Sequence, residues 1–308
     1  MSVYTTVDRG ELLTWLEPLC LGDLIDHAGI AAGMQNSNYF VTTTGGRFVL
    51  TLFEGIETAA LDFYLTLQDS LAQSGIPCPC PLSSGDGRHW RWLASKPAAL
   101  LTCLPGAALE SPYAGHCGIV GDVLARLHLA AANLADPLPN PCGAVWRQTV
   151  GATLLPLLSP DERTLLADEL AFQSAQDYAL LPRGIIHADL FRDNVLWDAE
   201  GRLSGILDFY FAGEDALLFD LAVVANDWCG DEASLKALIA GYERQRPLSE
   251  AERDAWPAMR RAAALRFWLL RLEVRHSPRR GEVVTIKNPD DFRHLLARFR
   301  LAPEALPR

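Results

Sequence analysis

Two aspartates and one asparagine occur at a spacing that suits metal-assisted phosphoryl transfer. Asp189 is followed five positions later by Asn194, and Asp208 ends a short apolar run further along the chain. A carboxylate can orient an acceptor hydroxyl and remove its proton, which is the role we predict for Asp189. Amide and carboxylate oxygens are hard ligands that suit Mg²⁺, so Asn194 and Asp208 are predicted to hold that metal on the phosphates of a nucleotide.

These residues need strand ends and a loop to position them, and the flanking sequence supplies both. Runs 184–187 and 194–197 are short and apolar, so Asp189 is expected on a loop between two strands. Residues 194–197 and 203–207 are predicted to form a hairpin around a turn. Carboxylates at strand ends are also common turn and cap residues. That plainer interpretation is kept for Asp193, Asp198 and Asp215.

The first hundred residues are predicted to form strands together with two helices, over 6–16 and 57–73. Gly45-Gly46 lies between two runs of β-branched and aromatic residues and can adopt the positive φ angles of a tight hairpin. Residues 88–93 and 98–102 are predicted to form another antiparallel pair. This part of the chain therefore favours an antiparallel sheet.

The pattern becomes mostly helical after residue 106, beginning with an apolar helix over 118–132. Two capping boxes that begin at Ser159 and Ser249 are typical of helix starts, and the second of these helices is predicted to be interrupted near Pro257. The sequence thus predicts an α+β fold. We place a β-rich N-lobe at residues 1–103 and a mostly α-helical C-lobe at residues 104–308.

The composition excludes several classes of protein. The chain has 308 residues, with 27 basic and 38 acidic side chains, so its net charge of −11 argues against a general binder of nucleic acid or anionic membranes. It contains no apolar run of about 18 residues that could span a membrane. Seven cysteines, an odd number, and an N-terminus without the features of an export signal predict reduced thiols and a cytoplasmic location.

The chain resembles the aminoglycoside-phosphotransferase and choline-kinase superfamily, and within it the homoserine kinases that have this protein-kinase-like fold. The resemblance covers nearly the full length. It is carried by the segments 35–40, 49–54, 97–100, 187–194, 208–211, 246–250 and 264–267. His-Ala-Asp at 187–189 is typical of the superfamily, and the aromatics at 209–211 narrow the resemblance to homoserine kinases.

This resemblance implies a bilobal kinase-like fold and transfer of the γ-phosphate of ATP, with Mg²⁺, to the side-chain hydroxyl of L-homoserine. We expect a monomer or homodimer, and the acidic charge balance favours a protein with no nucleic-acid or membrane partner. Two alternatives stay open. The same machinery could act on an aminoglycoside, choline or ethanolamine, or the chain could be a catalytically silent nucleotide-binding module.

The nucleotide site departs from the protein-kinase pattern. Thr51 occupies the position of the strand lysine that holds the α- and β-phosphates, and the chain has no Gly-x-Gly-x-x-Gly loop. A short polar loop is predicted to bind the phosphates instead through backbone N–H groups and small side chains. Its candidate residues are Gly33, Gln35, Asn36, Ser37 and Asn38.

Five further side chains are assigned partly through the resemblance. His187 is implied to be a scaffold of the catalytic loop, and Asp220 to brace that loop through its backbone N–H groups. Arg192 is predicted to neutralise the transferring phosphoryl group, with a plain surface arginine equally open. Arg266 lies in an apolar helical stretch and is predicted to bind the acceptor carboxylate, because a buried arginine is costly without a partner. Tyr210 is a candidate for the acceptor pocket or for the core.

Overall fold

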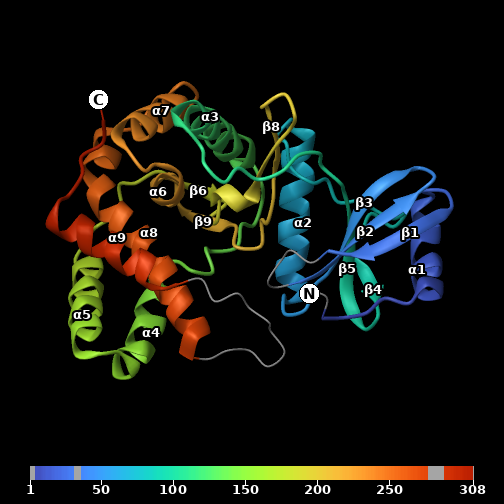
Figure 1. Cartoon of the computed structure of the whole chain (residues 1–308), viewed down its shortest axis with the longest axis horizontal. Coiled ribbons are helices and arrows are strands. Elements are labelled where there is room, and N and C mark those ends of the chain that lie inside the picture. Colours follow the sequence, from blue (N-terminus) through green and yellow to red (C-terminus); the bar gives the residue numbers. More distant parts are fainter. Residues whose placement is uncertain (1–3, 31–35, 277–287, 308) are drawn as a thin grey trace. The chain divides into compact units, whose positions relative to one another are not determined.

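The computed structural model describes residues 4–30, 36–276 and 288–307. These residues form two compact units (Figure 1). The first contains 4–30, 36–106 and 204–210, and the second contains 107–203, 211–276 and 288–307. Within the described ranges, no helix is long and apolar enough to cross a membrane.

The first unit is built on a five-stranded sheet with the strand order β1-β2-β3-β5-β4. Its helices and strands are α1 (Arg9–Leu16), the 3-10 helix η1 (Glu17–Leu19), β1 (Leu24–Gly29), β2 (Ser37–Thr43), β3 (Gly46–Leu52), α2 (Thr58–Gln73), β4 (Arg91–Leu93) and β5 (Lys96–Thr102). Neighbouring strands run antiparallel throughout, which confirms the expected antiparallel sheet.

The hairpin between β2 and β3 follows from its glycines. Thr43 pairs with Gly46, whose φ of +146° lies in the region that side chains with a Cβ rarely adopt. Along β2, buried and half-buried residues alternate, as expected for a strand with one face on the core. The buried face of the sheet packs with α1 in a cluster that includes Leu12, Val41 and Leu50.

Residues 204–210 belong to the first unit, whereas the sequence-based division at residue 103 assigned them to the second. The hydroxyl of Ser204 donates to the carbonyl oxygen of Pro105 at 2.6 Å, and the N–H of Ile206 donates to that of Pro77 at 2.7 Å. These hydrogen bonds join residues that are far apart in the sequence, so the local sequence around residue 204 does not predict them.

The second unit is mostly helical. Its elements are α3 (Ala114–Ala131), α4 (Ala144–Leu154), the 3-10 helix η2 (Leu155–Leu157), α5 (Pro160–Ser174), β6 (Arg183–Ile186), the 3-10 helix η3 (Arg192–Asn194), β7 (Val195–Trp197), β9 (Gly213–Ala216), α6 (Leu217–Trp228), α7 (Glu232–Glu243), α8 (Glu250–His276) and α9 (Asp290–Leu301). Strand β6 pairs with β9, and β7 pairs with β8 (Leu203–Ile206), so the predicted hairpin is confirmed.

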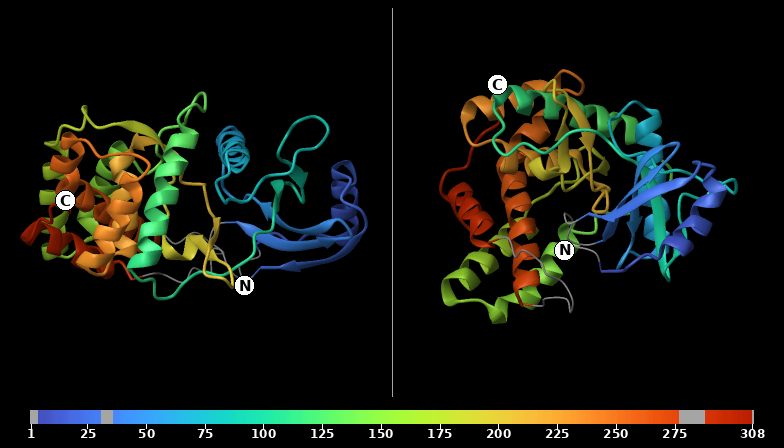
Figure 2. Two further views of the ribbon diagram at one scale, coloured as in Figure 1. Left: turned by 90° about the horizontal axis from the view of Figure 1, so that it is seen from above. Right: turned by 45° about the vertical axis from the view of Figure 1, so that its right-hand side comes forward.

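Helix α8 is the longest element of this unit and packs against α4, α6 and α9 (Figure 2). The capping boxes that precede α5 and α8 both form: Glu162 N–H and Glu252 N–H each donate to the hydroxyl of the serine three residues earlier. The predicted interruption near Pro257 is wrong, because α8 runs through this residue. Proline removes one backbone hydrogen bond, and the buried apolar face of α8 outweighs that loss.

Helices α3 and α7 approach each other closely at glycines. A Cβ atom on Gly121 would lie 2.1 Å from the carbonyl oxygen of Leu238, and one on Gly241 would lie 2.1 Å from that of Gly118. Backbone therefore packs on backbone here. This close packing brings Tyr242 of α7 against His128 of α3, which matters for the site below.

Candidate active site

The loop between β6 and η3 is held by a buried carboxylate from α6. Asp220 Oδ2 accepts the backbone N–H of His187 at 2.8 Å, and its Oδ1 accepts that of Ala188 at 2.9 Å. Asp220 and His187 are both fully buried. Ala188 has a φ of +64°, a left-handed conformation that costs energy for any residue with a Cβ. The two hydrogen bonds compensate for this strain and fix the direction in which Asp189 leaves the loop.

A histidine that the sequence analysis did not single out completes this support. His128 Nε2 lies 3.0 Å from Asp220 Oδ2, and its Nδ1 lies 2.8 Å from the hydroxyl of Tyr242. Burial raises the pKa of Asp220, but the hydrogen bonds from His128 and the His187 backbone outweigh it, so the pKa lies below its ordinary value. No sequence signal distinguishes His128, because the same helix also carries His116, Asp122 and Arg126.

Asp189 is held by donors on both carboxylate oxygens. Its Oδ1 accepts from Arg266 Nη1 at 2.9 Å, and its Oδ2 accepts from Asn194 Nδ2 at 3.3 Å. Its backbone N–H donates to His187 Nδ1 at 3.2 Å. Burial raises the pKa of Asp189 above its ordinary value, while the guanidinium of Arg266 opposes this rise. A desolvated carboxylate of this kind is a stronger base than an exposed one.

Asn194 is oriented by the loop it belongs to. Its Nδ2 donates to the backbone carbonyl of Asp189 at 2.8 Å, so the side-chain oxygen is the atom left to ligate a cation. The other predicted metal ligand, Asp208, follows β8 in the first unit with a φ of +63°. An amide oxygen and a carboxylate oxygen are each hard ligands of the kind that a divalent cation prefers. The described residues contain no cluster of three or more His, Cys, Asp or Glu side chains able to hold a metal without a nucleotide.

Two residues at the C-terminal end of α6 also form hydrogen bonds with this loop. Asp227 Oδ2 accepts both the backbone N–H of Arg192 at 2.8 Å and its Nε at 3.1 Å. Trp228 Nε1 donates to the carbonyl oxygen of Leu190 at 3.0 Å. Arg192 is thus paired within the second unit. The Arg192 side chain is 39% exposed and is paired with Asp227, so it is neither buried nor an isolated surface arginine.

The predicted phosphate loop is described only in part, because Gly33 and Gln35 lie outside the described residues. The hydroxyl of Ser37 accepts the N–H groups of Tyr4 and Thr5 at 2.8 and 2.9 Å, and it donates to Glu54 Oε1 at 2.7 Å. Ser37 is fully buried. Its side chain therefore ties the N-terminal segment to the end of β3 and is not free for a phosphate.

Glu54 links the end of this loop to a cation on the neighbouring strand. Its Oε2 lies 3.0 Å from Lys96 Nζ, and its N–H donates to Asn36 Oδ1 at 3.4 Å. Lys96 begins β5, which pairs with β3. Glu54 therefore contacts both Asn36 and Lys96, the only lysine among the described residues of the first unit. No local sequence pattern indicates these contacts.

Thr51 takes part in a neutral hydrogen-bonded group. Its hydroxyl donates to Asn38 Oδ1 at 2.8 Å. The Tyr210 hydroxyl bonds to Gln68 of α2 and to Thr51, which lowers the Tyr210 pKa, but burial dominates and leaves that pKa above its ordinary value. The Tyr210 ring packs edge-on against Phe53, with ring centres 5.2 Å apart. These contacts favour the core interpretation of Tyr210 over a place in the acceptor pocket.

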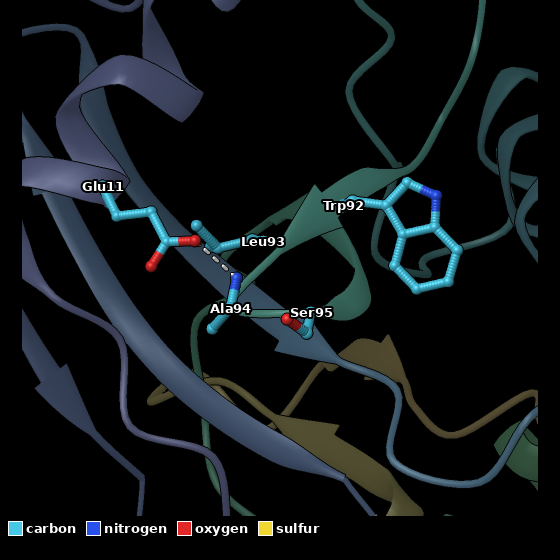
Figure 3. Close-up of a pocket in the computed structure, with 5 residues that line it drawn as sticks. All are labelled: Glu11, Trp92, Leu93, Ala94 and Ser95. Atoms are coloured by element: carbon cyan, nitrogen blue, oxygen red, sulfur yellow. Dashed lines mark hydrogen bonds between the residues drawn. The ribbon is translucent and has the colours of Figure 1, made fainter.

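A separate hollow lies at the turn between β4 and β5 (Figure 3). There the Glu11 carboxylate accepts the N–H of Ala94 at 2.7 Å, and Trp92, Leu93 and Ser95 also line the hollow. Glu11 is the only charged residue of this lining, so the hollow offers no pair of metal ligands and no cation for a phosphate. None of the residues predicted to carry the chemistry lies there.

A family model described as "Phosphotransferase enzyme family" matches residues 26–262. The chain belongs to this family. The phosphotransferase is 44% identical to a homoserine kinase of Methylobacillus flagellatus over 99% of this chain and 98% of the relative. It is likewise 44% identical to a homoserine kinase of Neisseria meningitidis serogroup B, over 96% of this chain and 99% of the relative.

Solved structures agree on the fold of this phosphotransferase. It matches the crystal structure of a spectinomycin phosphotransferase in complex with ADP and spectinomycin, with a TM-score of 0.70 and 12% identity, over 96% of this chain and 98% of that one. A choline kinase of Streptococcus pneumoniae matches with a TM-score of 0.68 and 14% identity, over the same shares of the two chains. The predicted kinase-like fold, with a β-rich N-lobe and a helical C-lobe, is confirmed.

Proposed function

We propose that this phosphotransferase transfers the γ-phosphoryl group of ATP to the side-chain hydroxyl of L-homoserine, giving O-phospho-L-homoserine in the cytoplasm. The observation that carries the substrate is the identity of 44% over nearly the whole length to relatives named homoserine kinase. The observation that carries the reaction is Asp189, a desolvated carboxylate on a loop fixed by Asp220.

In this proposal Asp189 orients the acceptor hydroxyl and accepts its proton as the bond to phosphorus forms. The side-chain oxygens of Asn194 and Asp208 would hold Mg²⁺, which when bound neutralises charge on the phosphates. Arg192 lies three residues after Asp189, and its exposed fraction leaves the guanidinium accessible while Asp227 sets its direction. We propose that it stabilises negative charge on the transferring group.

The nucleotide phosphates are proposed to bind at the loop that contains Gly33, Gln35, Asn36, Ser37 and Asn38. Because the Ser37 hydroxyl has three protein partners, the contribution of this loop is assigned to backbone N–H groups and to the amides of Asn36 and Asn38. The chain is proposed to act as a monomer or homodimer on a small molecule, without a nucleic-acid or membrane partner.

The test is release of ADP from Mg·ATP with a panel of acceptors: L-homoserine, L-serine, L-threonine, choline, ethanolamine and kanamycin. The proposal predicts strong and selective turnover of L-homoserine. Selective turnover of another alcohol would contradict L-homoserine as the substrate but would support the proposed phosphoryl transfer. Binding of Mg·ATP with no turnover of any acceptor would contradict the reaction and favour a silent nucleotide-binding module.

A further inference from the structure

Arg266 of α8 is completely buried, yet only part of its guanidinium has a hydrogen-bond partner. Its Nη1 donates to Asp189 Oδ1 at 2.9 Å. Its Nε and Nη2 have no hydrogen-bond partner among the described residues. The thiol of Cys142 also lies against the group, but a thiol is a weak acceptor. A buried cation with unused donors is unfavourable, so this arrangement calls for a further acceptor.

The position of the two unused nitrogens limits what that acceptor can be. Nε and Nη2 form one edge of the planar guanidinium, and a carboxylate can bind such an edge through two parallel hydrogen bonds. Two aromatic rings pack against the group, since its central carbon is 3.9 Å from the ring centre of Phe267 and 4.7 Å from that of Phe211. Because Nη1 already donates to Asp189, the Nε–Nη2 edge is the part of the group that offers two donors to a polar ligand.

We infer that Arg266 couples recognition of the acceptor to the catalytic carboxylate. Its Nε–Nη2 edge takes the carboxylate of an amino-acid acceptor while its Nη1 keeps Asp189 aimed at the acceptor hydroxyl. The inference rests on the proposed function and deepens it, because it names a positioning role beyond binding. Both nitrogens are shielded from solvent, so acceptor binding must open the packing beside this edge.

In this arrangement Arg266 makes the enzyme selective for the length of the acceptor. The carboxylate at one edge and the hydroxyl at Asp189 must be reached by one molecule, which selects hydroxy acids whose two groups are a fixed number of carbons apart. It also makes the acceptor carboxylate contribute to kcat and not only to KM, because filling the edge holds the guanidinium against Asp189. A purely structural ion pair would lack both consequences.

The wild-type protein provides the first test, with acceptors that each lack one charged group. The acceptor 4-hydroxybutanoate keeps the carboxylate and the carbon spacing of L-homoserine but lacks the ammonium group, whereas 3-aminopropan-1-ol lacks the carboxylate. We expect kcat to fall about 10²-fold for 3-aminopropan-1-ol relative to L-homoserine, and much less for 4-hydroxybutanoate. Equal kcat values for the two analogues would overturn the inference.

The second test compares Arg266→Lys and Arg266→Gln with the control Arg271→Lys. Arg271 also lies on α8 but pairs with Asp291 at 2.8 Å, outside this site. Arg266→Lys keeps the positive charge but lacks two parallel N–H donors. It should therefore lose the preference for 4-hydroxybutanoate over 3-aminopropan-1-ol. Arg266→Gln removes the positive charge as well as the two parallel donors, and it should lose the same preference. The control should keep this preference.

Different results would contradict the Arg266 inference and the proposed function. Losses that are equal for both analogues would reduce Arg266 to a structural role and overturn the inference alone. Absence of L-homoserine turnover by the wild type would contradict the proposed function, and the inference with it. If the Arg266 variants do not fold, the wild-type comparison decides.

Discussion

The hydroxyl of Thr51 on β3 donates a hydrogen bond to Asn38 Oδ1 on β2, at 2.8 Å. Thr51 is 4% exposed, and from the sequence we match it to the strand lysine that holds the nucleotide phosphates in protein kinases. With Gln68 and Tyr210 it forms a neutral group in the first unit. The position is therefore a hydrogen-bonded part of the core, and phosphate anchoring must come from other residues.

Replacing Thr51 by valine should lower stability and spare catalysis. The change removes the donor to Asn38 and leaves a half-buried amide oxygen without its partner, which costs about 1–3 kcal/mol of unfolding free energy. Urea denaturation measures this loss, with the exposed helical change Thr14→Val as a control that should stay within about 0.5 kcal/mol of the wild type. We expect kcat to stay close to the wild-type value and the KM for ATP to rise by about a few-fold at most, because the Asn38 amide stays in place but loses one partner. A collapse of ATP binding with stability intact would mean that Thr51 contacts the phosphates.

Replacing Asp220 by asparagine should destabilise the second unit in a pH-dependent manner. An amide cannot accept both loop N–H groups and the His128 bond, and removing one partner from a buried charged network costs about 3–5 kcal/mol. Because the folded pKa of Asp220 lies below its unfolded value of about 3.9, its contribution is present above that pH and is lost as the pH falls.

The stability gap between the wild type and Asp220→Asn should thus be full at pH 6 and narrower at pH 3.5. Urea unfolding at both pH values measures it, and the exposed change Asp161→Asn, in the first turn of α5, serves as the control. A gap that widens towards acid pH would show that Asp220 is not held ionised by the catalytic loop.

The parts of the fold that could be predicted have local signals. The hairpin depends on the φ freedom of Gly46, and the starts of α5 and α8 depend on a serine and a glutamate three residues apart. The pairing of Asp189 with Asn194 on one short loop is also a local feature, since the two residues are five positions apart. Such patterns specify their own neighbourhood and little beyond it.

What could not be predicted depends on contacts between distant residues. Arg266 and Asp189 are 77 positions apart, and nothing near either one indicates that Nη1 meets Oδ1. His128 and Asp220 are 92 positions apart, and a histidine in an apolar helix has many possible uses. Pro257 lies inside α8 although a proline locally disfavours a helix, because the packing of α8 against its neighbours outweighs that local cost.

The rate of O-phospho-L-homoserine formation by the wild type and by Asp189→Asn decides whether Asp189 is the base. Both are measured with saturating Mg·ATP and L-homoserine, and ATP affinity is measured by calorimetry. Asparagine keeps the size of the side chain and removes the base, so we predict a kcat lower by about 10²–10⁴-fold with ATP affinity retained. A wild-type rate in a folded Asp189→Asn protein would contradict the assignment of the base and the mechanism built on it.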